Sequence, residues 1–215
     1  MDLKLNSELA KSADNIVSGI KESGKYIGTI TRAELLKAST GTIGLGLSFK
    51  SDSGQTADYL DLYHTKASGE TLSSAKTVSA ILCCTKVADA KEGRIKVEKW
   101  NADRGAREVV DVDGYPALMG KRVGFLLQQT LETDDKGRDR ERLQIFAVFN
   151  AETELTASEM YAKKTNPERL SSMLDVLMAR PVRDNRKNKG ARGHHSSDSA
   201  GPDRFDGIPD DDAPF

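Results

Sequence analysis

Residues 42–50 alternate cleanly between apolar side chains and small or polar ones. Ile43, Leu45, Leu47 and Phe49 fall on one side of this run, and glycine, serine and lysine fall on the other. A period of two residues is that of a β-strand with one face against a core. A second alternating run, residues 57–64, follows the turn signal of residues 51–54, so the two runs predict neighbouring strands.

Further strand signals lie on both sides of one helical pattern. Residues 25–36 are rich in β-branched side chains, whereas apolar residues recur at helical spacing over 73–85. Strand patterns then return at residues 94–100, 108–112, 123–131 and 142–150. This order predicts a mainly β fold with flanking helices: an OB-fold-like five-stranded barrel with a helix between strands 3 and 4. Another small barrel or a sandwich is the alternative.

Two more helices are expected at the flanks of the strands. Apolar residues recur weakly over residues 1–22, and that pattern ends near Gly24. Asn166 and Pro167 are typical of an N-cap and a first helical position, which predicts a helix over 167–179 that ends before Pro181. One face of this helix carries Leu170, Met173, Leu174, Leu177 and Met178.

Charge divides the end of the 215-residue chain into two contrasting segments. Residues 180–195 contain six basic residues and one acid, and residues 196–215 contain six acids and one base, Arg204. So few apolar side chains cannot bury enough surface to order such a segment. We therefore expect one folded domain over 1–180 and a disordered linker and acidic tail over 181–215.

The sequence argues against secretion, membrane insertion and a disulfide framework. No apolar run approaches the ~18 residues of a membrane span, and the N-terminal residues lack a signal-peptide core. Cys83 and Cys84 are the only cysteines, and neighbours on a helix point too far apart to form a disulfide with each other. A cytoplasmic protein with buried thiols is expected.

The acidic tail ends in Asp210, Asp211, Asp212, Ala213, Pro214 and Phe215. This tip resembles the acidic, Pro-Phe-terminated tip of bacterial single-stranded DNA-binding proteins, although Ala213 stands where those usually have isoleucine. The resemblance implies that Phe215 and its carboxylate enter a basic-rimmed pocket on replication, repair and recombination proteins. Asp210, Asp211, Asp212 and Pro214 would support that contact by electrostatic steering and an extended backbone.

Three segments within residues 1–165 favour the same function. Residues 18–26 read SGIKESGKY, residues 44–49 read GLGLSF, and residues 115–121 read YPALMGK. They resemble a family of phage-encoded single-stranded DNA-binding proteins found beside recombination genes. The resemblance implies binding of single-stranded DNA, but no base-contacting residue is carried over from it.

Binding of single strands without sequence preference needs cations for phosphates and aromatic faces for bases. In the run 94–100, Arg94, Lys96 and Trp100 fall on one strand face together with Glu98. Trp100 either stacks on bases or caps the core. On 57–64, Tyr59 and Tyr63 are four residues apart, so they share a face as groove-lining residues or as a structural pair. The remaining phosphate candidates, each of which is otherwise an ordinary solvated side chain, are Lys25, Arg32, Lys50, Lys121 and Arg122.

Enzyme chemistry is not expected. The chain has no P-loop, no Ser/His pairing signature and no acidic or histidine cluster at metal-ligand spacing, so neither a cofactor nor a metal is predicted. The predicted function is protection of single-stranded DNA during phage replication and recombination, with partner proteins recruited by the tail. The alternative is a recombination accessory or adaptor protein that works by protein interaction only. Self-association into a homo-oligomer is left open.

Overall fold

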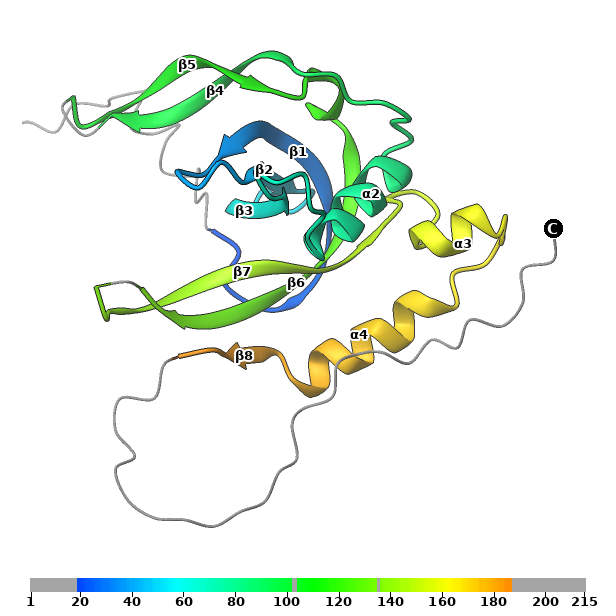
Figure 1. Cartoon of the computed structure of the whole chain (residues 1–215). Coiled ribbons are helices and arrows are strands. Elements are labelled where there is room, and N and C mark those ends of the chain that lie inside the picture. Colours follow the sequence, from blue (N-terminus) through cyan, green and yellow to red (C-terminus); the bar gives the residue numbers. More distant parts are fainter. Residues whose placement is uncertain (1–18, 102–103, 135, 187–215) are drawn as a thin grey trace, which may run out of the picture.

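The computed structural model describes residues 19–101, 104–134 and 136–186 of the chain, and β-strands dominate it (Figure 1). The elements follow in this order: β1 Gly24–Lys37, β2 Ile43–Ser51, β3 Thr56–Thr65, α2 Ser74–Cys84, β4 Gly93–Asn101, β5 Ala106–Gly114, a short 3-10 turn Pro116–Leu118, β6 Arg122–Thr133, β7 Asp139–Phe149, α3 Ala157–Tyr161, α4 Arg169–Ala179 and β8 Val182–Asp184. The mainly β prediction is confirmed, and α2 does lie between the third and fourth strands.

All eight strands belong to one sheet that stays open. The long strand β1 pairs with β6 through its first half and with β2 through its second half, and β3 pairs with β2. β3 and β7 come close to each other, but among the described residues no hydrogen-bonded ladder joins them. The expected closed barrel of five strands is therefore not formed. Apart from β8, which runs parallel to β6, the paired strands are antiparallel.

The inner face of the curled sheet holds the main core. Leu45, Leu47 and Phe49 of β2 are buried as their alternation predicts, and the ring of Phe49 meets the edge of Phe125 at 5.1 Å between centroids. Helix α2 closes one end with Ile81 and Cys84. Both cysteines are free thiols, and burial, with a smaller contribution from Cys83, raises the pKa of Cys84 to about 12.

A second apolar cluster fills the space between α4 and the outer face of the sheet. Leu170 and Leu177 of α4 pack on Leu126, Ala147 and Phe149 from β6 and β7. Met178, which the sequence analysis placed on the buried face of this helix, is 53% exposed. The helix therefore covers the sheet with a narrower apolar face than its sequence indicated.

The start of α4 is set by a residue from another segment. Its N-cap is Glu168 and not Asn166, so the predicted start is two residues early. The carboxylate of Glu159, on the preceding short helix α3, accepts hydrogen bonds from the backbone N–H groups of Glu168 and Arg169 at 2.8 and 2.9 Å. Helix α3 itself was not predicted; Thr156 and Glu159 form a capping box at its start.

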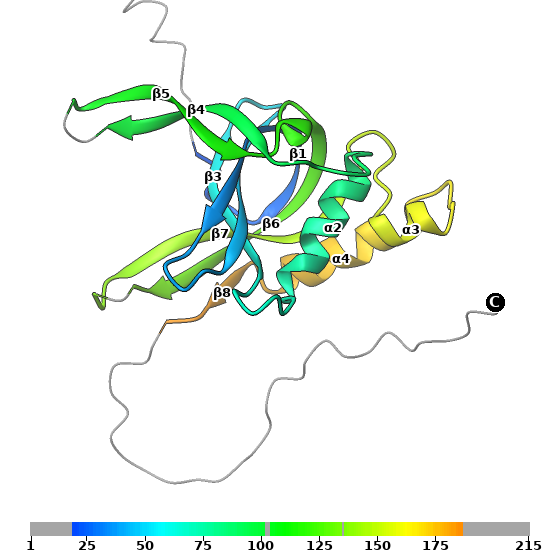
Figure 2. The same cartoon turned by 45° about the horizontal axis from the view of Figure 1, so that its top comes forward.

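Two long hairpins, β4–β5 and β6–β7, reach out on the same side of the molecule (Figures 1 and 2). Helices α2 and α3 lie on the opposite side in both views. The β4–β5 hairpin joins β1 through β5, and the side chains of Ile95 and Val97 on β4 are buried. None of the described helices is long and apolar enough to span a bilayer.

The two ends of the described body meet at one corner. Gly19 forms a parallel bridge with Thr56, and the hydroxyl of Ser23 donates to the carbonyl of Pro181, 158 residues away. β8 pairs with residues 129–131 of β6, so residues 182–184 belong to the sheet and not to the expected linker. The predicted helix over 1–22, up to residue 18, and the tail residues Asp210, Asp211, Asp212, Pro214 and Phe215 lie outside the described residues.

Candidate functional site

Over the second half of β1 and over β2 and β3, the outer face of the sheet has no helix packed against it in the described part of the chain, and small residues line its centre. A Cβ atom on Gly44 would lie 2.9 Å from the Tyr63 ring, and one on Gly46 would lie 3.0 Å from the side chain of Leu36. Glycines in a strand allow such close approach. Tyr63 and Leu36 therefore pack directly on the two glycines, which are buried, and together they form the floor of this face.

Tyr59 stands at an irregularity of β3 above this floor. Between the pairs Leu47–Leu60 and Phe49–Ala57, β3 has one more residue than β2, and Tyr59 has φ +60°. This bulge lies between Ala57 and Leu60, and residues 60–63 pair with β2 in a regular register. It leaves the Tyr59 ring 66% exposed, with the Arg32 guanidinium 5.5 Å from its centroid. Such a ring presents a free aromatic face backed by a cation.

Three of the predicted phosphate-binding residues come together next to Tyr59. Arg32 from β1, Lys50 from β2 and Lys96 from β4 line one hollow of about 790 Å³, which we call the hairpin hollow. Among the described residues, Lys50 and Lys96 form no ion pair. Asp58 and Glu98 also line the hollow, so its charge is mixed.

Arg32 is the most constrained cation of this surface. Its side chain is buried between two acids: the shortest nitrogen–oxygen distance is 3.4 Å to Glu34 and 3.8 Å to Asp61. The second distance is too long for a hydrogen bond, and Nε and Nη2 of Arg32 have no hydrogen-bond partner in the described structure. Lys99, from the β4–β5 hairpin, approaches Glu34 at 2.6 Å.

Asp61 shares this unsatisfied environment. Burial raises the pKa of its carboxyl, the nearby Glu34 adds to the increase, and the cations Arg32 and Arg142 oppose it. Its Oδ1 atom also lacks a hydrogen-bond partner among the described atoms. A buried charged group without its full set of hydrogen bonds costs free energy, and this is a common feature of functional sites.

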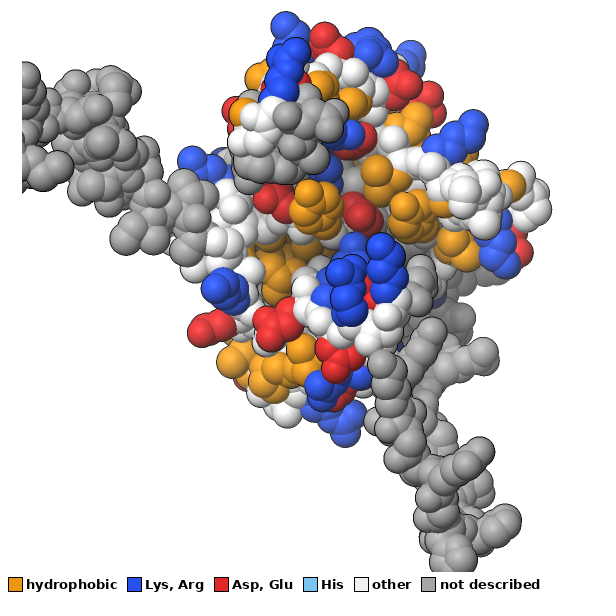
Figure 3. Space-filling model, turned by 90° about the vertical axis from the view of Figure 1, so that its left-hand side faces the viewer, with side chains coloured by type: hydrophobic (Ala, Val, Ile, Leu, Met, Phe, Trp, Pro, Cys, Tyr) orange, Lys and Arg blue, Asp and Glu red, His pale blue; other side chains and the backbone are white. Residues whose placement is uncertain are grey.

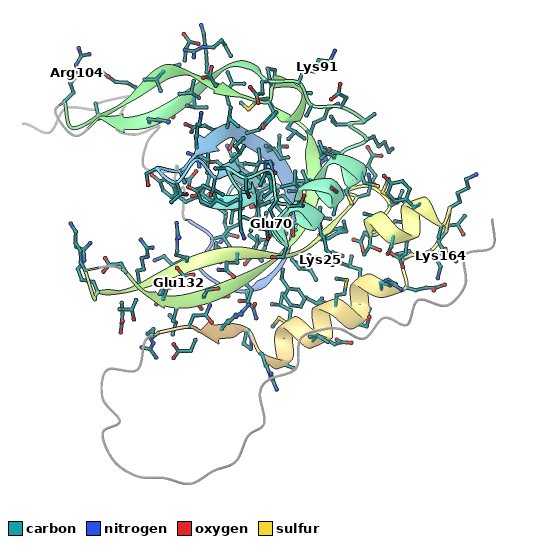
Figure 4. The ribbon with its side chains drawn as sticks, in the orientation of Figure 1. Lys25, Glu70, Lys91, Arg104, Glu132 and Lys164 are labelled. Carbon is teal, nitrogen blue, oxygen red and sulfur yellow. The ribbon has the colours of Figure 1, made fainter. Side chains whose placement is uncertain are left out.

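The other predicted cations lie away from the hairpin hollow, and three of them, Lys25, Arg94 and Arg122, are paired with acids. Lys25 contacts Glu154 at 2.5 Å and lies toward α3 and α4. It is therefore away from the outer ends of the two hairpins, on which Arg104 and Glu132 are labelled in Figure 4. Arg122 forms a bidentate pair with Asp52 at 2.9 and 2.7 Å. Arg94 bonds to Asp113 at 2.9 Å. Lys121 is exposed in the loop before β6 and does not line the hollow.

Trp100 is placed only by its backbone. It pairs with Arg107 within the β4–β5 hairpin, and its side chain lies outside the described residues. Whether Trp100 stacks on bases or caps the core therefore stays a prediction.

Two cations that face this surface were missed by the sequence analysis. Lys99 precedes Trp100 and points to the opposite face of β4, where it contacts Glu34. Arg142 of β7 approaches Asp61 at 4.0 Å. The signal for Arg142 is the alternation of residues 142–146, in which Arg142, Gln144 and Phe146 face away from the partly buried Leu143 and Ile145. Toward the hairpin tips, basic side chains gather at several points around hydrophobic ones (Figure 3).

Within the described residues, no group of three or more His, Cys, Asp or Glu side chains is arranged to hold a metal ion.

No protein-family model matches the chain, and a search of curated proteins finds no significant match.

Proposed function

We propose that this protein binds single-stranded DNA, with little sequence preference, on the open outer face of β1, β2 and β3. The observation that carries the proposal is the hairpin hollow, where Arg32, Lys50 and Lys96 come from three separate strands. The exposed Tyr59 ring stands next to Arg32. Cations for phosphates beside an aromatic face for bases are the chemistry that unpaired strands require.

The fold is proposed to be OB-like. In this interpretation β1, β2, β3, β6 and β7 are the five strands, α2 follows the third, and the β4–β5 hairpin is an insertion. The pairing of β1 with both β2 and β6 supports it. The open face of β1, β2 and β3 would then be the face on which OB-folds bind oligonucleotides.

The C-terminal tip is proposed to recruit partner proteins. Phe215 supplies an apolar anchor and a terminal carboxylate, and Asp210, Asp211 and Asp212 attract a basic partner surface. The resemblances of tip and body place this activity in phage DNA replication and recombination, inside a bacterial host. The sequence alternative, an adaptor that never touches DNA, makes the opposite prediction for the experiment below.

The test is a titration with an oligothymidine of about 30 nucleotides, roughly two to seven OB-fold sites. Trp100, the only tryptophan, reports binding by its emission. We expect tight binding at low salt and a steep loss of affinity as salt rises. The double variant Lys50→Ala/Lys96→Ala should lower the salt slope by about 1.4, since each single-strand phosphate contact contributes about 0.7.

The matched control is Lys91→Ala, an exposed lysine in the loop before β4, outside the hairpin hollow (Figure 4). It should behave like the unchanged protein. No binding at low salt would overturn the proposal and favour the adaptor. Binding that the double variant retains unchanged would place the site elsewhere.

A further inference from the structure

The hairpin hollow has neighbours on the same side of β3. It shares Gly19, Thr56 and Asp58 with a smaller hollow of about 370 Å³. That smaller hollow shares Tyr59, Arg142 and Leu143 with a third one of about 770 Å³, which we call the seam hollow. The three hollows are therefore neighbours in a row from the β4–β5 hairpin across β3 to β7.

The seam hollow lies where β3 and β7 approach without hydrogen bonding. Its walls carry Tyr59 and Phe146, which are 66% and 37% exposed, and the cations Arg142 and Arg183. Hydroxyl groups from the start of α2 face it as well, and Asp61 is the only acid among the described residues that line it. Its two arginines repeat the cationic chemistry of the hairpin hollow with less negative charge, and two aromatic side chains are added.

Both arginines are only loosely engaged by protein acids. The shortest distances from Arg142 to carboxylate oxygens are 3.8 Å to Glu132 and 4.0 Å to Asp61, beyond hydrogen-bond length. Arg183 donates from Nε to the Asn185 side chain at 3.2 Å and has no ion pair with a described residue. Arg183 is held at this place because β8 pairs it with Thr130 of β6.

We infer that the open seam between β3 and β7 is a second subsite for the same single strand, in which Arg142 and Arg183 contact phosphates and Phe146 stacks on a base. This inference rests on the proposed function and extends it to residues that the sequence analysis did not select. It gives β8 a role: the short strand fixes a phosphate-binding arginine at the far end of the path. The bound strand would run from Lys96 past Tyr59 to Arg183.

The test uses the full chain with the variants Arg142→Ala, Arg183→Ala and Phe146→Ala, titrated with oligothymidines of increasing length. Each arginine variant should lower the salt slope by about 0.7. Phe146→Ala should weaken binding about fivefold or more with an unchanged slope, because stacking does not release counterions. All three should bind the shortest oligonucleotides as the unchanged protein does, since those fit within the hairpin hollow.

Two further variants keep the result interpretable. Arg169→Ala removes an exposed arginine on α4, away from the path, and should change nothing. Arg183→Lys keeps the charge and should restore the salt slope. Thermal unfolding of each variant excludes a loss of fold as the cause.

The outcomes separate this inference from the proposed function. If the unchanged protein ignores DNA, both fail. If Lys50→Ala/Lys96→Ala weakens binding while the three seam variants behave like Arg169→Ala, the second subsite is wrong and the proposed function stands. If the seam variants lose affinity for a peptide of residues 206–215 but not for DNA, the seam binds acidic peptide and the inference is overturned.

Discussion

The outer face of the sheet differs between the two halves of strand β1: α4 covers it at the first half, and no described helix covers it at the second half. Through its first half, β1 packs Ile27 toward α4, where Leu126, Phe149 and Leu177 are completely buried. Through its second half the same strand presents Arg32 and Glu34 beside the glycine-lined floor of β2. On the covered part, apolar side chains pack against each other. On the open part, buried polar atoms of Arg32 and Asp61 have no hydrogen-bond partner in the described structure.

This difference separates what stabilises the molecule from what the molecule can bind. Apolar burial under α4 contributes to folding whether or not a ligand is present. Buried charges with incomplete hydrogen bonding add little to stability and are poised to interact with an incoming group. Changes on the covered face should therefore affect unfolding, and changes on the open face should affect binding.

The largest expected effect comes from a matched pair of glycines, one on each face. In Gly124→Ala the new Cβ would lie 2.0 Å from the buried Phe149 ring, which we expect to cost about 3 kcal/mol of unfolding free energy. In Gly46→Ala the three nearest atoms to the new Cβ all belong to the half-buried Leu36 side chain, the closest at 3.0 Å, so we expect a smaller loss after a small shift of that side chain. Urea unfolding of both variants measures the difference; equal losses would contradict the contrast.

The next effect concerns the carboxylate that connects α3 and α4. Burial favours the neutral form of Glu159, but hydrogen bonds from the backbones of Thr156, Arg169 and Glu168 and from the Thr156 hydroxyl lower its pKa to about 2. The stabilisation is therefore complete above the ordinary value of 4.5 and is lost as the pH falls through about 2.

Glu159→Gln should accordingly cost about 1–3 kcal/mol at neutral pH. The gap between variant and unchanged protein should narrow on acidification from pH 5 toward 2. Urea unfolding at several pH values measures it, with the exposed Glu92→Gln as the control. A gap that stays constant over this range would show that the charge of Glu159 is not what caps α4.

The smallest effect is expected on the open face. Asp61→Asn removes a negative charge between Arg32 and Arg142, so oligothymidine binding should tighten about fivefold at low salt. Because the pKa of Asp61 is raised, the unchanged protein should show the same tightening as acidification protonates Asp61, and the variant should not. Asp89→Asn, which changes the net charge equally outside the hollows, is the control. Equal tightening in both variants would indicate a general charge effect.

Periodicity in the sequence was enough to predict the strands and α2. It was not enough for β8, because three exposed residues in a basic segment carry no alternation. The start of α4 depends on Glu159, nine residues before the N-cap Glu168, and local capping rules do not consider that distance. Closure of the sheet depends on how far β3 and β7 approach, which no local pattern specifies.

The sequence predicted only part of the candidate site, because ion pairs between distant segments are not visible in a local pattern. Arg32, Lys50 and Lys96 were selected as cations near strand patterns, and the fold brings them together. Lys25 and Arg122 were equally plausible from their local sequence, yet Glu154 and Asp52 come from distant segments to pair with them. Such pairing across the fold decides which cations remain available, and it is invisible in a single sequence.

The contact between Ser23 and Pro181 has a practical consequence for engineering. Because the two ends of the described body meet there, a short peptide could join them, and new termini could be opened at the turn between β6 and β7 without crossing the core. With residues 206–215 attached to the new C-terminus, such a circular permutant would carry the acidic tip on a hairpin at the rim of the proposed binding face. It would test how much the proposed recruitment depends on where that tip is attached.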